Sequence, residues 1–243
     1  MTQTTQIQAM SSDIAAKLTE ELLSIIEGSG DVLRRTISRS GQYYEDHDLL
    51  MIFSAVAEKM IGRPFTTDAN QQKVIVTLMK WLLGEPKPKL DLKKGICLIG
   101  PVGCGKTTVI EVLSQISYAM GYEYELQGQR SAFHWPTTPS YEIIDALIHG
   151  ARLKEFANQP ILFIDSLGTE PKSVNYCGTT FSPIRQLMSM RCSRKDQMTF
   201  ITMRDTDAVE MLNNYGEDAS SLLHGLCNVL HYSGPDYRQI KTE

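Results

Sequence analysis

The feature that most constrains this chain is an apolar run that leads directly into a glycine-rich loop and then a helix. The run ICLIG at 96–100 continues into GPVGCGKTT at 100–108, a full match to the pattern G-x-x-x-x-G-K-[ST]. Glycines let such a loop wrap so that backbone N–H groups point at phosphate oxygens, and the N-terminus of the following helix adds its positive dipole. We therefore predict a nucleotide phosphate site made by Gly100, Pro101, Val102, Gly103, Cys104, Gly105, Lys106, Thr107 and Thr108.

A second apolar run, ILFID at 161–165, ends in Asp165. Phosphate loops of this kind work with a carboxylate at the end of a neighbouring strand, which holds the shell of a magnesium ion. Lys106 is expected to reach the β- and γ-phosphates, Thr107 to ligate Mg²⁺ through its hydroxyl, and Asp165 to hold the metal. The alternative for Asp165 is a surface residue that ends a core strand. The predicted cofactors are ATP and Mg²⁺.

The position after Asp165 bears on whether the nucleotide is hydrolysed. A second carboxylate often activates water at such a site, and this chain has Ser166 there, which is a poor base. Glu170 is the nearest acidic residue beyond it. The sequence leaves two interpretations of Glu170 open, a catalytic carboxylate and a solvated loop charge.

Apolar runs and helical patterns alternate through the second part of the chain. Strands are expected at 96–100, 122–127, 161–165, 198–203 and 227–232. Helices are expected from Lys106, from Thr138-Pro139, from Ser182-Pro183 and within 205–226. Strands that alternate with helices imply an α/β fold with a parallel sheet covered on both faces. The first 85 residues read as helices, at 12–27, 48–62 and 68–84.

Composition excludes several classes of protein. The net charge of −4 argues against strong non-specific binding of nucleic acid by the whole monomer, but not against a local basic patch. The five cysteines are scattered without a CxxC pair, which indicates a reducing compartment and no structural zinc. The N-terminus lacks the pattern of a secretory signal, and no apolar stretch approaches a membrane span. We expect a cytoplasmic protein with no membrane partner.

Four stretches together resemble the DnaC/IstB-like AAA+ ATPases, which include replicative helicase loaders and transposition ATPases. They are FTTDANQQKVIVTLMKWLLGE, DLKKGICLIG, FIDSLGTE and NNYGEDASSLLHGLCNVLHYSGPDYR. The first stretch looks like the variants found in Bacteroides-type genomes and mobile elements. The resemblance covers roughly residues 65–238, so we expect a helical segment at 1–64 and an AAA+ ATPase domain at 65–243.

The resemblance implies a P-loop fold with a RecA-like sheet in the order 51432. It also implies a homo-oligomer, either a ring or a filament, with ATP near the subunit interfaces. Single-stranded DNA and a helicase or transposase are the implied partners. Arg238 in GPDYR matches a position that can act as a C-terminal sensor near the γ-phosphate.

Three departures from the family pattern concern hydrolysis. Ser166 replaces a second acidic residue, Arg204 stands near the place of a polar sensor with Thr202 as the nearest hydroxyl, and Leu222 lies where relatives often have an arginine. An arginine that acts on the transition state can contribute about 10³–10⁵ in rate, whereas the phosphate cradle also binds the ground state. The sequence therefore predicts an ATP-dependent switch with slow or partner-dependent hydrolysis. A catalytically weak scaffold or adaptor is the alternative, and a small-molecule kinase is a third.

Three further groups of residues have two interpretations each. Arg191 and Arg194 are candidates to replace the missing arginine, or they are cations at a helix end. Phe133 and Trp135 are core or interface residues, or they stack on single-stranded bases. Cys104 is a small loop residue, or it is sensitive to oxidation beside the lysine.

Overall fold

The structure, a computed structural model, describes residues 15–27, 44–85, 89–126, 129–176, 179–194 and 197–239. The chain divides into two compact units. Unit 1 comprises Met1–Leu90 and Thr108–His134, and unit 2 comprises Asp91–Thr107 and Trp135–Glu243. Within the described ranges no helix is both long and apolar enough to cross a membrane.

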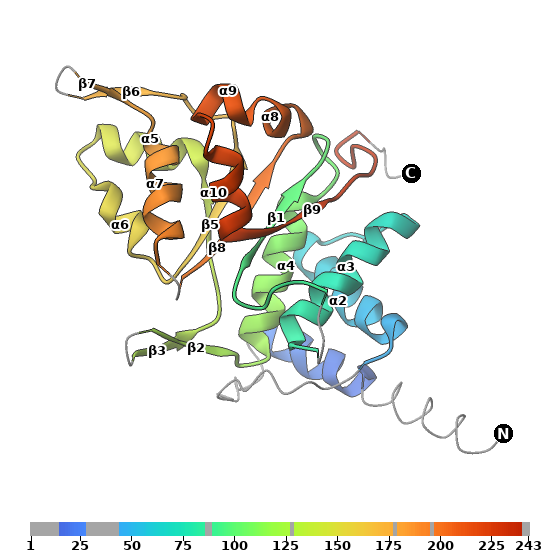
Figure 1. The fold of residues 1–243 in the computed structure, drawn as a ribbon. Helices are drawn as coiled ribbons and strands as arrows, with labels where there is room; N and C mark the ends of the chain where they lie inside the picture. Colours follow the sequence, from blue (N-terminus) through green and yellow to red (C-terminus); the bar gives the residue numbers. More distant parts are fainter. Residues whose placement is uncertain are drawn as a thin grey trace, which may run out of the picture. The chain divides into compact units, whose positions relative to one another are not determined.

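Unit 1 is mainly helical (Figure 1). Residues 15–26 are helical, and α2 (Asp46–Ile61) and α3 (Ala69–Leu83) follow. The helix α4 (Lys106–Ala119) belongs to unit 1 from Thr108 onward, and its first two residues belong to unit 2. These elements confirm the predicted helices, except that the predicted start of the first one, at 12–14, lies outside the described residues. The Asp68 carboxylate accepts hydrogen bonds from two amides of the first turn of α3, and a capping box is complete. Gly62 and Gly84 end α2 and α3 in the left-handed conformation.

Unit 1 also contains a hairpin that the sequence placed in the main sheet. Strands β2 (Glu123–Leu126) and β3 (Gln129–Ala132) pair antiparallel with each other and do not join the larger sheet. The prediction that 122–127 forms a strand of the parallel sheet is therefore wrong. The physical reason lies in its pattern, because YEYEL alternates polar and apolar residues, whereas a strand buried on both faces is continuously apolar.

Unit 2 is built on a five-stranded sheet in which every pairing is parallel. Its strands are β1 (Gly95–Ile99), β4 (Thr137–Pro139), β5 (Ile161–Leu167), β8 (Met198–Met203) and β9 (Cys227–His231), in the order β4-β5-β8-β1-β9. Numbered along the chain within this sheet, the order reads 2-3-4-1-5, which is 51432 in reverse. The predicted α/β P-loop fold and strand order are confirmed.

The strand β4 is the second strand of this sheet along the chain and lies at its edge. It occupies residues where the sequence predicted the start of a helix. Thr138 and Pro139 lie in this three-residue edge strand, and α5 (Ser140–Ile148) begins after them. The predicted cap at Thr138 and first helical position at Pro139 are wrong for this reason. A short edge strand tolerates proline, because the missing N–H removes no ladder bond from a central position.

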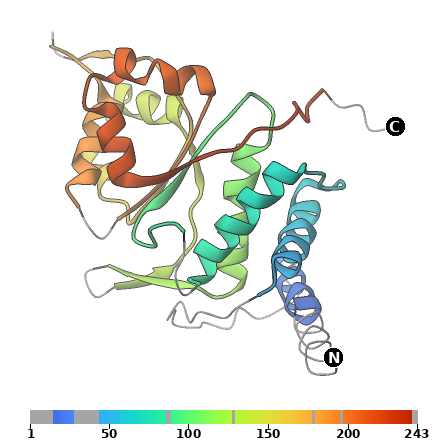
Figure 2. The same cartoon turned by 45° about the vertical axis from the view of Figure 1, so that its right-hand side comes forward.

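The remaining elements of unit 2 are α6 (Leu153–Ala157), α7 (Pro183–Cys192), α8 (Asp205–Val209), α9 (Met211–Tyr215), α10 (Ala219–Leu226) and a hairpin of β6 (Val174–Tyr176) with β7 (Thr179–Phe181). One buried cluster joins side chains of β1, β5, β8 and β9 to those of α5, α7 and α10. Figure 1 shows these helices grouped beside the sheet, and Figure 2 shows the β6–β7 hairpin projecting from the unit.

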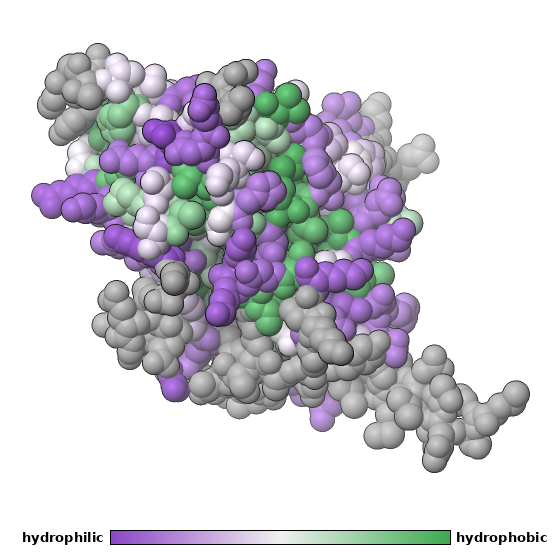
Figure 3. Space-filling view, in the orientation of Figure 1, coloured by the Kyte–Doolittle hydropathy of each residue, from purple (hydrophilic) through white to green (hydrophobic). Residues whose placement is uncertain are grey.

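The two aromatic residues considered for base stacking belong to the interior. Phe133 is 2% exposed and its ring lies 6.5 Å from that of Trp81. Trp135 is 1% exposed and stacks on Phe200 at 4.0 Å. The core interpretation is confirmed for both. Large apolar side chains that stay exposed include Tyr141 and Ile148 of α5, and Figure 3 shows hydrophobic patches among the hydrophilic residues of the face in view.

Arg191 is a structural residue of unit 2, and its interpretation as a replacement catalytic arginine is wrong. It is 1% exposed at the end of α7. Its guanidinium donates to Thr199 Oγ1 at 2.8 Å, to Gln159 O at 2.7 Å and to Met198 O at 2.6 Å. These bonds tie α7 to the start of β8 and to the chain before β5. Arg194 donates to Ala157 O at 2.9 Å on the same side.

We expect Arg191→Leu to lower the free energy of unfolding by about 2–4 kcal/mol, because it leaves several buried acceptors without a donor. Urea denaturation of the two proteins measures the difference. The matched control is Arg185→Leu, since Arg185 is half-exposed and pairs with Asp218 at 2.9 Å. That control should change stability by no more than about 1 kcal/mol. Equal effects of the two substitutions would contradict the assignment of Arg191 to the interior.

Candidate functional site

The P-loop joins the end of β1 to the start of α4. At three of its positions the backbone conformation or the surrounding atoms favour glycine over any residue with a side chain. Gly103 and Gly105 have φ of 76° and 97°, in the left-handed region that side chains rarely adopt. A Cβ built on Gly100 would overlap the carbonyl oxygen of Tyr232. The loop therefore has a tight wrap, which is typical of loops whose backbone N–H groups bind an anion.

Lys106, the first residue of α4, folds back over this loop. Its ammonium group donates to Gly100 O at 2.9 Å and to Pro101 O at 2.6 Å, and the residue is 9% exposed. The positive charge is thereby held at the loop itself. A lysine at this place supplies positive charge to phosphates bound by the loop.

Thr107 and Asp165 meet across the carboxyl ends of two strands. Thr107 Oγ1 donates to Asp165 Oδ1 at 2.7 Å, and Thr202 Oγ1 of β8 donates to the same oxygen at 2.6 Å. Because β8 lies between β1 and β5 in the sheet, its hydroxyl is placed between the P-loop and the Asp165 carboxylate. The structure thus brings together the two predicted metal-binding residues, with Thr202 as a third polar group.

This donor set fits Mg²⁺. The ion prefers oxygen ligands and is bound in proteins through one or two protein groups together with substrate phosphates. Thr107 and Asp165 offer a hydroxyl and a carboxylate oxygen in direct contact. Within the described residues no group of three histidine, cysteine or acidic side chains could hold a metal on its own. These residues suit a metal that arrives with a nucleotide.

Ser166 adopts a strained backbone conformation beside Asp165. Its φ of 58° is the one positive value at a non-glycine residue among those described, and the register of β5 with β8 shifts between Ile164 and Leu167. The Ser166 amide donates to Thr202 Oγ1 at 2.9 Å, and its hydroxyl donates to Asp165 Oδ2 at 3.2 Å. Ser166 therefore orients the carboxylate, which its sequence position alone did not indicate.

Glu170 is a buried carboxylate that anchors its own loop. It is 3% exposed, so the solvated-charge interpretation is wrong. Its Oε2 accepts from Gly168 N at 2.9 Å, and its Oε1 accepts from the hydroxyl of Tyr215 in α9. Both oxygens thus have donors within the protein. The catalytic role of Glu170 stays a prediction, but the geometry favours a carboxylate that positions the loop after β5.

Neighbouring contacts hold the same loop. Burial and the nearby Glu170 carboxylate raise the pKa of Tyr215 far above its ordinary value, so Tyr215 stays a hydrogen-bond donor. Lys172 donates to Gly168 O at 2.6 Å.

A Cβ built on Gly168 would overlap Asp207, which pairs with Arg204 at 2.7 Å. Arg204 is occupied in this ion pair, and Thr202 is the polar residue of β8 that contacts Asp165.

The segment after β9, residues 232–239, forms what we name the C-terminal strap. Cys104 Sγ donates to Tyr232 O at 3.1 Å, and Tyr237 N donates to Gly103 O at 3.0 Å. The strap therefore contacts the P-loop directly. Arg238 lies in the strap, and it is exposed. Its backbone amide donates to Asp236, which places the backbone of Arg238 near the P-loop. The structure shows no bond from the Arg238 side chain to the described residues.

Cys104 is a buried thiol. Burial raises its pKa, an effect that the nearby Lys106 ammonium partly offsets. A raised pKa keeps the sulfur protonated, and oxidants react with the thiolate form. The small-residue interpretation of Cys104 fits this environment better than the redox-sensitive one.

Comparison with known proteins finds similar solved structures. No protein-family model and no curated protein sequence matches this chain. A crystal structure of the DnaC helicase loader is similar at 20% identity, over 69% of this chain and 93% of that chain, with a TM-score of 0.48. A crystal structure of DnaI is similar at 14% identity, over 69% of this chain and 87% of that chain, with a TM-score of 0.47. The structure of AMPPCP-bound DnaA from Aquifex aeolicus is similar at 12% identity, over 69% of this chain and 48% of that chain, with a TM-score of 0.46. Function therefore has to be argued from the residues of this chain.

We expect Glu170→Gln to reduce any ATP turnover by less than about tenfold, since its oxygens position a loop, whereas loss of a catalytic base typically reduces the rate by about 10²–10⁴. Single-turnover hydrolysis measures this rate. Tyr215→Phe is the matched variant, because it removes the hydroxyl that Glu170 accepts from. Both should lower the free energy of unfolding by about 1–3 kcal/mol. A hundredfold rate loss in Glu170→Gln with unchanged stability would instead identify Glu170 as the base.

Proposed function

We propose that this protein binds ATP with Mg²⁺ at the P-loop and acts as an ATP-dependent oligomeric switch. The observation that carries the proposal is the contact of Thr107 Oγ1 with Asp165 Oδ1 at the end of a phosphate loop. The loop amides and Lys106 hold the phosphates, and Thr107 and Asp165 hold the metal. When bound, the metal neutralises phosphate charge. The remaining polar groups, Thr202 and Ser166, orient the Asp165 carboxylate.

We further propose that hydrolysis of ATP is slow or needs a partner. Near Asp165, the acidic residue Glu170 is buried with both oxygens bonded. Arg191 is enclosed in the interior, and α10 contains no arginine. A partner or a second copy of the chain would then supply the group that stabilises the transition state. Arg238 is the proposed C-terminal sensor, because it is exposed on the strap that contacts the P-loop.

The sequence resemblance to DnaC/IstB-like ATPases supports a role in DNA replication or transposition. We propose single-stranded DNA and a replicative helicase or transposase as partners, with the domain at 65–243 as the ATPase and 1–64 as a separate helical segment. The cytoplasm is the expected location. The buried position of Glu170 also favours a second candidate, a nucleotide-stabilised scaffold or adaptor without useful turnover.

Equilibrium titration with labelled ATP tests the binding step. Lys106→Ala and Asp165→Asn should each weaken Mg²⁺-dependent ATP binding by tenfold or more, since each removes a group that contacts the phosphates or the metal. The matched control is Lys94→Ala, because Lys94 donates to His224 O at the opposite end of β1. Wild-type affinity in the two site variants would contradict the proposal.

Turnover separates the two candidates. We expect slow steady-state hydrolysis by the isolated chain that rises at least tenfold when single-stranded DNA or a partner protein supplies the missing group. A phosphate-release assay with and without DNA measures this. Brisk hydrolysis by the isolated chain would rule out partner dependence, and an absence of stimulation under all conditions would favour the scaffold.

A further inference from the structure

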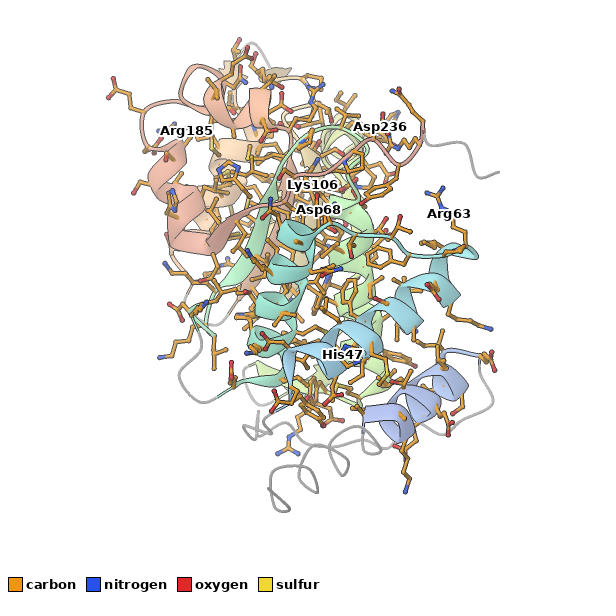
Figure 4. The ribbon with its side chains drawn as sticks, turned by 90° about the vertical axis from the view of Figure 1, so that its right-hand side faces the viewer. His47, Arg63, Asp68, Lys106, Arg185 and Asp236 are labelled. Carbon is orange, nitrogen blue, oxygen red and sulfur yellow. The ribbon has the colours of Figure 1, made fainter. Side chains whose placement is uncertain are left out.

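Asp236 is an acidic side chain packed directly against the phosphate loop. A Cβ built on Gly103 would overlap the Asp236 carboxylate, so this carboxylate occupies the space beside the bare Cα of the glycine. Figure 4 labels Asp236 and Lys106, which lie toward the same end of unit 2. A negative charge is therefore held beside a loop whose proposed ligand is a polyanion.

The Asp236 charge is not neutralised by a cation within the part of the chain that the structure describes. Its Oδ1 accepts from the amide of Arg238 at 3.0 Å, and its Oδ2 accepts from Gln239 Nε2 at 2.9 Å. Both donors are uncharged, and the Lys106 ammonium is directed to loop carbonyls. These bonds fix the orientation of the carboxylate without removing its charge.

The strap also fixes the peptide that follows Gly103. Tyr237 N donates to Gly103 O, and the peptide bond is trans, so the Cys104 N–H points away from the strap. Asp236 belongs to the strap and packs beside the Gly103 Cα, so its carboxylate lies on the side of this peptide opposite to that N–H.

We propose that Asp236 lowers the nucleotide affinity of the P-loop by charge repulsion and thereby makes bound nucleotide exchange readily. The proposal rests on nucleotide binding at this loop, as set out above. Repulsion across a partly solvated loop is reduced by water but not removed, because Asp236 is only half-exposed. The affinity of the site for nucleotide is then lower than the P-loop motif alone would give, because of the Asp236 charge in the strap.

The test is the affinity and dissociation rate of fluorescently labelled ATP for the full chain. Asp236→Asn removes the charge and keeps an oxygen that can accept from the Arg238 amide. We expect its dissociation constant to fall roughly three- to tenfold, with slower release, and the difference to shrink at high salt because ions screen the charge. Asp236→Ser, a second charge-free variant with an acceptor hydroxyl, should behave in the same way.

Asp218→Asn is the matched control, since it removes an equal charge from an aspartate whose carboxylate pairs with Arg185, outside the P-loop. It should leave nucleotide affinity unchanged. Weaker or equal binding by both Asp236 variants, with measurable binding by the wild type, overturns the Asp236 proposal alone. If neither the wild type nor the Asp236 variants bind nucleotide, both proposals fall. Binding by the variants but not by the wild type supports charge repulsion.

Discussion

The contact between the Thr107 hydroxyl and the Asp165 carboxylate is the constraint on which the site depends. The two residues are 58 positions apart in the chain and their oxygens lie 2.7 Å from each other. Such a contact needs parallel strands whose carboxyl ends meet at one edge of a sheet. It also needs β8 between β1 and β5, so that Thr202 can donate to the same carboxylate. The contacts at Asp165 therefore depend on the order of the strands in the sheet.

Around that contact, the polar side chains form hydrogen bonds that fix the loop and orient Asp165. Ser166 orients Asp165 from a strained backbone, and Glu170 fixes the next turn through Gly168 and Tyr215. The network stabilises a loop next to the proposed metal site. A carboxylate that activates water must have an oxygen within hydrogen-bond reach of that water, whereas both Glu170 oxygens accept hydrogen bonds from the protein. We infer that the chain is better suited to binding a nucleotide than to hydrolysing it alone, and that the strap adjusts how tightly it binds.

Local pattern was sufficient for much of the fold. The continuous apolar runs at the start of β1 and β5 predict buried strands, and the partly apolar stretches MTFITM and CNVLH predict β8 and β9. The helix ranges 48–62 and 68–84 were also predictable, because the signals that end a helix act within a few residues. The sheet to which β2 belongs and the strand β4 were predicted wrongly for a related reason. A three-residue edge strand that contains Pro139 carries little local signal, and YEYEL fits a hairpin as well as a sheet strand.

The sequence by itself determined the phosphate loop and the strand that ends in Asp165, because both are contiguous patterns tied to one chemistry. Only the tertiary structure decided the surroundings of Glu170, Arg191 and Asp236. Each is a charged residue whose role depends on which distant groups surround it: Tyr215 for Glu170, Met198 for Arg191 and Gly103 for Asp236. Burial and bonding partners are properties of the folded chain, and spacing along the sequence does not encode them locally.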